Sequence, residues 1–88
     1  MELYKSVIRR YLSEYACSLR EKRGLTQAEM AERLRITERA YSDLERGVYC
    51  FSTVPLVSLL LMLKSDEFKE IIEPLRGEIA KLEAGEVA

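Results

Sequence analysis

Few residues in the chain could perform covalent or metal chemistry. It has no histidine and two cysteines, Cys17 and Cys50, among its 88 residues. Without imidazole, Ser-His and Cys-His nucleophilic pairs and histidine metal sites are excluded, and two cysteines alone do not form a zinc site. The cysteines are too few and too far apart for a disulfide framework, so we expect small buried thiols. The sequence therefore predicts neither an enzyme nor a metal or cofactor site.

Composition is that of a small globular protein. The chain is 48% hydrophobic and 33% charged, with 14 basic and 15 acidic side chains. A chain this short lies near the lower limit for a self-sufficient core, so partner chains could supply missing burial. Its carboxylates fall at helix-surface spacing among cations, which favours a solvated face over acid/base catalysis. No apolar run is long enough to cross a bilayer and the N-terminus is unlike a signal peptide, so we expect a soluble cytoplasmic protein without a membrane contact.

A long amphipathic helix is expected at the N-terminus. Its apolar residues recur at steps of three and four, the spacing of one helical face. They are Leu3, Tyr4, Val7, Ile8, Tyr11, Leu12, Tyr15, Ala16 and Leu19. Gly24 suits a left-handed C-cap, because cations precede it at the negative end of the helix dipole. We place this helix at about residues 3–23, with residues 1–15 as an N-terminal extension.

Two short helices are expected next, at about residues 26–34 and 38–46. Thr26 and Glu29 have the spacing of a capping box, and Thr37 offers a second N-cap. Gly47 closes the second helix. The expected inward residues are Met30, Ala31 and Leu34 in the first of these helices, and Tyr41 and Leu44 in the second.

Two further helices are expected in the C-terminal half. Pro55 fits a helix's first turn, and the run at residues 56–63 is apolar nearly all round, so we expect it to be buried on most sides. Ser65 can cap a last helix, which Pro74 would either kink or restart. An apolar seam follows heptad spacing along this helix: Phe68, Ile72, Leu75, Ile79 and Leu82. The seam could pack on the chain's own core, but we favour a homodimer interface, in which residues 73–88 form a possible dimerisation segment.

Residues 19–47 resemble the helix-turn-helix of the Cro and phage-repressor type, also called the XRE family. The matching residues are the run from Arg20 to Gln27, Ala31 and Leu34, the hydroxyl cap Thr37, and the closing stretch from Leu44 to Gly47. The resemblance continues more weakly through Pro55, Leu56, Leu59 and Leu63 to Phe68. It covers about residues 16–72 and implies an all-α, five-helix, lambda-repressor-like DNA-binding domain, here with an extended first helix and a C-terminal helix.

On this resemblance, the helix at 38–46 would present its outward residues to the major groove. The expected base-reading residues are Glu38, Arg39, Ser42 and Asp43, because Tyr41 and Leu44 point inward. The expected phosphate contacts are Gln27, Arg23, Thr26 and Arg46. In the family, the acid matching Glu45 pairs with the arginine matching Arg20, so we expect a partly buried ion pair behind the DNA-facing surface.

Three features depart from the family pattern. Arg35 stands where the turn usually has glycine, and the apolar loop 48–51 stands where basic residues often touch phosphate. The chain has a net charge of −1 and a pI near 5.5, without the strong basic footprint of a non-specific DNA binder.

The sequence thus favours a sequence-specific regulator of transcription, expected to be a repressor, that reads a palindromic operator as a homodimer. Tyr4, Tyr11 and Tyr15 of the first helix compete with the C-terminal seam for the dimer interface. The alternative function is a helix-turn-helix module that has lost DNA binding and holds a partner protein, in the manner of an antitoxin or an anti-repressor.

Overall fold

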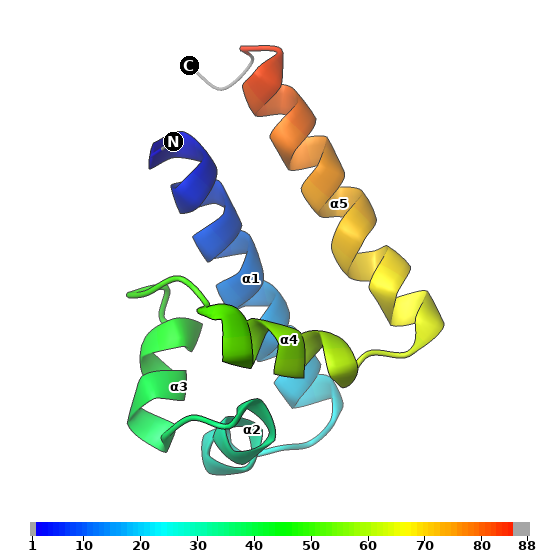
Figure 1. Ribbon diagram of the computed structural model, residues 1–88. Coiled ribbons are helices and arrows are strands. Elements are labelled where there is room, and N and C mark those ends of the chain that lie inside the picture. Colours follow the sequence, from blue (N-terminus) through cyan, green and yellow to red (C-terminus); the bar gives the residue numbers. More distant parts are fainter. Residues whose placement is uncertain (1, 86–88) are drawn as a thin grey trace.

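The computed structural model describes residues 2–85, which contain five α-helices and no strand. They are α1 (Glu2–Lys22), α2 (Gln27–Leu34), α3 (Glu38–Glu45), α4 (Thr53–Leu61) and α5 (Ser65–Glu83). In Figure 1, α1 and α5 are the two long helices, and α2 and α3 lie together at the end of the molecule opposite to both termini. The predicted all-α, five-helix fold is confirmed. Residue 1 of the predicted extension and residues 86–88 of the predicted C-terminal segment lie outside the described residues.

Local capping defines where α2 and α3 begin. The Thr26 hydroxyl accepts from the Glu29 amide at 3.1 Å, and the Glu29 carboxylate accepts from the Thr26 amide at 2.8 Å. The Thr37 hydroxyl accepts from the Ala40 amide at 3.1 Å. Each bond satisfies a backbone group that a helix terminus would leave unpaired. The two short helices are therefore delimited by their own sequences.

Arg35 ends α2 in the left-handed conformation, with φ of 63° and ψ of 40°. A residue with a Cβ is strained there, by on the order of 1 kcal/mol. Its guanidinium donates to the hydroxyl of the buried Ser58 at 2.9 Å. This side chain therefore ties the turn between α2 and α3 to α4, a contact that glycine could not make.

The core forms where α1 meets the three short helices and the start of α5. The predicted inward residues of α2 and α3 are all buried. The buried residues of the core are Leu12, Ala16, Leu19, Met30, Ala31, Leu34, Tyr41, Leu59, Leu63 and Ile71. Ala16, which is fully buried, is small enough for neighbouring helices to approach α1 closely.

Three sequence-based expectations about burial and capping were wrong. The apolar run around α4 is not buried on most sides, because one side of α4 faces the core through Leu59 while the other leaves Val57 45% and Leu61 75% exposed. Cys17 and Cys50 are free but only half-buried. Ser65 is the first residue of α5 rather than its cap, because a Glu67 carboxylate oxygen accepts from the Lys64 amide at 2.9 Å.

The helix α5 continues through Pro74, so of the two expected effects of this proline, a kink or a restart, the restart does not occur. Proline has no N–H, which leaves the carbonyl of Glu70 without its usual helical donor. The Tyr11 hydroxyl of α1 lies over this turn, 2.6 Å from the Ile71 carbonyl and 3.3 Å from the Glu70 carbonyl. Tyr11 therefore compensates for the missing donor and joins α1 to α5.

Candidate nucleic-acid interface

The outward face of α3 carries the four predicted base-reading residues. Tyr41 is completely buried and Leu44 nearly so, which fixes the rotation of α3 on the core. Glu38 and Arg39 are consequently exposed, whereas Ser42 and Asp43 are half-buried. Asp43 forms an ion pair with Arg46 one turn further on. The structure thus brings a guanidinium, a hydroxyl and two carboxylates together on one face of a short helix.

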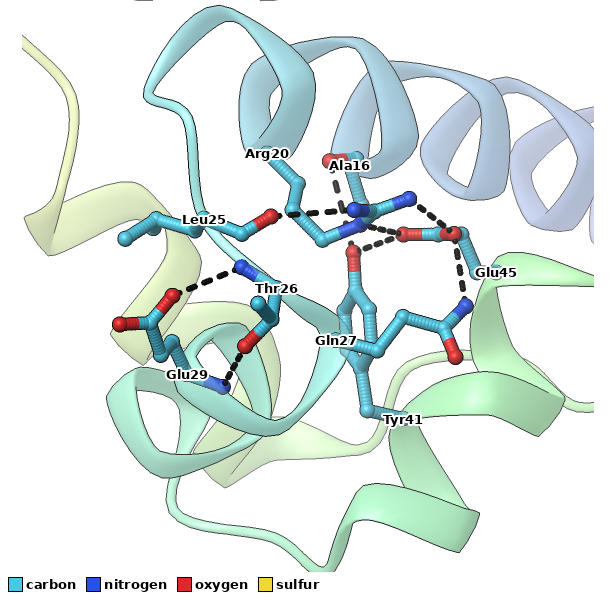
Figure 2. A network of polar contacts seen from close by, with 8 residues as sticks. All are labelled: Ala16, Arg20, Leu25, Thr26, Gln27, Glu29, Tyr41 and Glu45. Carbon is cyan, nitrogen blue, oxygen red and sulfur yellow. Dashed lines mark hydrogen bonds and ion pairs between the residues drawn. The ribbon is translucent and has the colours of Figure 1, made fainter.

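An ion pair behind this face joins α1 to α3, as Figure 2 shows. Arg20 Nε donates to Glu45 Oε2 at 2.7 Å, and Arg20 Nη2 donates to Glu45 Oε1 at 3.0 Å. Arg20 Nη1 also donates to the Leu25 carbonyl at 3.0 Å. This forked geometry is the strongest arrangement available to an arginine and a carboxylate. It holds the C-terminal end of α3 at a fixed position on α1.

Two further donors satisfy the Glu45 carboxylate. Gln27 Nε2 donates to Oε1 at 3.0 Å, and the Tyr41 hydroxyl donates to Oε2. Burial by itself would raise the pKa of Glu45, but the hydrogen bonds from Arg20, Tyr41 and Gln27 outweigh it and lower this pKa to about 2. Burial, followed by donation to Glu45, raises the pKa of Tyr41. The charge of Glu45 is therefore neutralised within the protein and does not belong to the acidic surface of α3.

Three of the four residues predicted to contact phosphate lie at the start of α2 or just after the end of α3. Gln27 opens α2 and Thr26 caps it, although the Gln27 amide nitrogen is already bound to Glu45. Arg46 follows the last residue of α3, with its side chain 66% exposed. These three residues flank the unit formed by α2 and α3.

Arg23 is engaged elsewhere. Its guanidinium donates to Glu67 Oε1 at 2.6 Å and to the Met62 carbonyl at 3.1 Å, at the junction of α4 and α5. Lys22 also binds Glu67, at 3.2 Å. The Lys64 amide, together with these two cations, lowers the pKa of the buried Glu67 to about 2. Sequence reasoning missed this ion cluster, since only the position of Glu67 in a first helical turn signalled a role.

The predicted seam of α5 is partly open to solvent. Phe68 and Ile72 are 41% and 40% exposed, whereas the neighbouring Ile71 is in the core. Leu75, Ile79 and Leu82 are half-buried. An open groove of about 350 Å³ follows this face, lined by Ile72, Leu75, Arg76, Ile79, Ala80 and Glu83. The seam therefore flanks the side of α5 that touches the core and is free to meet another surface.

Two capped helices at a tight corner, held by α1 and α4, define a helix-turn-helix domain. The family described as helix-turn-helix matches residues 18–67, more than half of the chain. The chain belongs to this family, the Cro/C1 or XRE type, as its sequence indicated, and is a DNA-binding regulator. Members are typically not enzymes.

Comparison with curated proteins and with solved structures gave no match. None of the helices within residues 2–85 is long and apolar enough to span a membrane. In the same residues, no group of three or more Cys, Asp or Glu side chains is arranged to hold a metal ion.

Proposed function

We propose that the protein is a sequence-specific transcriptional repressor that binds a palindromic operator as a homodimer. The observation that carries this proposal is the outward face of α3, where Arg39 and its neighbours are held by the burial of Tyr41 and Leu44. A rigid helix with polar groups on its free side meets the requirement for reading base edges in the major groove. A repressor of this kind acts by occupying its site and needs no catalytic group.

The four side chains of this face have complementary hydrogen-bonding capacities. Arg39 can donate two parallel bonds to guanine O6 and N7, and Glu38 or Asp43 can accept from cytosine N4. Ser42 can reach either a base or a phosphate. We therefore expect a half-site that contains G·C pairs at the positions facing Arg39 and the two carboxylates.

Contacts to the DNA phosphates would lie on both sides of the outward face of α3. The free amides at the start of α2, with Gln27 and Thr26, suit one phosphate, and Arg46 at the end of α3 suits another. Arg23 has the weakest support as a phosphate contact, since it already binds Glu67.

The α5 seam supports a homodimer. Phe68 and Ile72 expose apolar surface next to the groove formed by Leu75 and Ile79. Two of the three competing tyrosines are already engaged within the chain, because Tyr11 is hydrogen-bonded to α5 and Tyr15 packs on the core, whereas Tyr4 is half-buried. Dimers of helix-turn-helix proteins bind half-sites about 10 bp apart, or a multiple of that distance, and we expect the same spacing here.

A protein-interaction module is the alternative, and two apolar surfaces favour it. Val48 and Tyr49 are exposed in the loop after α3, and Val54, Val57 and Leu61 form an exposed stripe on α4. Exposed apolar patches of this kind often mark sites of protein contact.

Selection of bound duplexes from a random DNA library separates the two functions. A specific repressor should enrich one palindrome, and its affinity for that duplex should fall steeply as salt is added. If no sequence is enriched even at low salt, the interaction module becomes the better account.

A further inference from the structure

A basic cavity lies between α1 and the end of α3, and its α1 side has not been considered above. Its volume is about 490 Å³. The residues lining it are Ser6, Arg9, Arg10, Ser13, Glu14, Glu45, Arg46 and Gly47. The α1 residues of this set recur at helical spacing, so one stripe of the N-terminal extension faces the segment that follows α3.

The free positive charge of this cavity comes from α1. Within residues 2–85, neither Arg9 nor Arg10 forms an ion pair or a side-chain hydrogen bond. Of the carboxylates nearby, Glu45 is bound by Arg20, and Asp43 is bound by Arg46. Glu14, the other carboxylate that lines the cavity, is exposed and has no such partner within residues 2–85. Two guanidinium groups are thus available to an anion.

The cavity continues the reading face of α3. Arg39, Asp43 and Arg46 follow one another along the helix surface at steps of four and three. Arg46 and Gly47 then line the cavity together with the α1 arginines. A duplex that receives the N-terminal half of α3 in its major groove passes its sugar-phosphate backbone beside the other end of α3.

We propose that Arg9 and Arg10, together with Arg46, hold a phosphate of the DNA backbone. This inference rests on the proposed function and names a contact from a part of the chain that precedes the matched family region, residues 18–67. The contact also gives an acidic chain a local source of DNA affinity, because two arginines that neutralise phosphate release counterions from the DNA. Glu38 and Asp43 would then contribute to discrimination between bases.

The test uses the full chain and fluorescence anisotropy with two duplexes of equal length, the selected one and a random one. Arg9→Ala/Arg10→Ala should weaken binding to both duplexes by the same factor and reduce the slope of log K against log salt by about 1 per lost contact. The double variant Lys69→Ala/Lys81→Ala is the control, since it removes the same charge from exposed positions of α5. Arg9→Lys/Arg10→Lys should keep most of the salt slope.

A salt slope of Arg9→Ala/Arg10→Ala equal to that of the wild type, or to that of the α5 control, would overturn the phosphate contact. A second result would also overturn it: the two substitutions abolish binding of inorganic phosphate but leave the affinity for DNA unchanged. Failure of the wild type to enrich any duplex is a different result and counts against the proposed repressor. A melting curve of each variant confirms that it is folded.

Discussion

Arg20 and Glu45, which are 25 residues apart in the sequence, form a two-pronged ion pair whose shorter bond is 2.7 Å. Their side chains are only 17% and 8% exposed. The pair joins α3 to α1, so the same acid that makes α3 look anionic in sequence serves to anchor this helix. The orientation of the outward face of α3 therefore depends on a contact made within the protein, between α1 and α3.

Replacing one partner of this pair should destabilise the fold strongly. Arg20→Met keeps most of the side-chain volume but leaves Glu45 buried beside Tyr41 without its cation. A broken buried pair typically costs about 3 kcal/mol or more of unfolding free energy, which urea denaturation would measure. Arg76→Met is the matched control, because Arg76 and Glu73 form an exposed pair at 3.9 Å, and its cost should stay below about 1 kcal/mol. Equal losses in the two variants would show that the pair has no special structural role.

Stability should fall in acid through the pKa values of Glu45 and Glu67. Both pKa values are about 2 in the folded protein, below the ordinary value of 4.5. Between these values the unfolded chain binds more protons than the folded one, so unfolding becomes easier as the pH drops from about 5 towards 2. Thermal melts across this range should show the decline, and Glu45→Gln should make it shallower. Glu73→Gln, at an exposed position, should follow the wild-type curve.

The turn residue Arg35 offers a test of strain against contact. Arg35→Ala loses the bond to Ser58 and keeps the left-handed backbone, whereas Arg35→Gly loses the bond and relieves the strain. The glycine variant should therefore be more stable than the alanine variant by about 1 kcal/mol. Chemical denaturation of the two proteins compares them directly, and an alanine variant as stable as the glycine variant would mean that the turn is unstrained. Ser58→Ala isolates the hydrogen bond.

The proposed dimer interface can be tested on α5. Ile72→Glu places a charge in the exposed seam and should shift the protein to a monomer with weaker operator binding, as truncation after residue 73 should also do. Leu61→Glu introduces the same charge on the exposed stripe of α4 and should leave the mass unchanged. Solution scattering gives the mass of each variant. A monomeric wild type would contradict the dimer. Dissociation caused only by Leu61→Glu would place the interface on α4 instead of α5.

The helix-turn-helix could be predicted from sequence because its signals are local. Thr26 with Glu29, and Thr37 with the first turn of α3, are caps that a short stretch of sequence contains in full. The surroundings of α4 and α5 could not be predicted in the same way. An apolar run does not reveal how much of it the rest of a small chain can cover, as Leu61 shows.

Ion pairs between residues far apart in the sequence could not be predicted from the sequence pattern either. Arg23 seemed available for phosphate from its place beside Gln27, but its partner Glu67 is 44 residues away. The Arg20 and Glu45 pair was expected only because the family resemblance implied it. Long-range ion pairs depend on the packing of helices, which a periodic pattern does not specify.

Base reading by α3 is tested most directly by selecting bound duplexes with the wild type and with Arg39→Ala in parallel. We predict that the wild type enriches a palindrome and that Arg39→Ala loses base preference at one position in each half-site, worth about 1–3 kcal/mol, while the preference at the other positions persists. An identical palindrome from both proteins would contradict base reading by α3, and the absence of any enriched sequence would contradict DNA recognition itself.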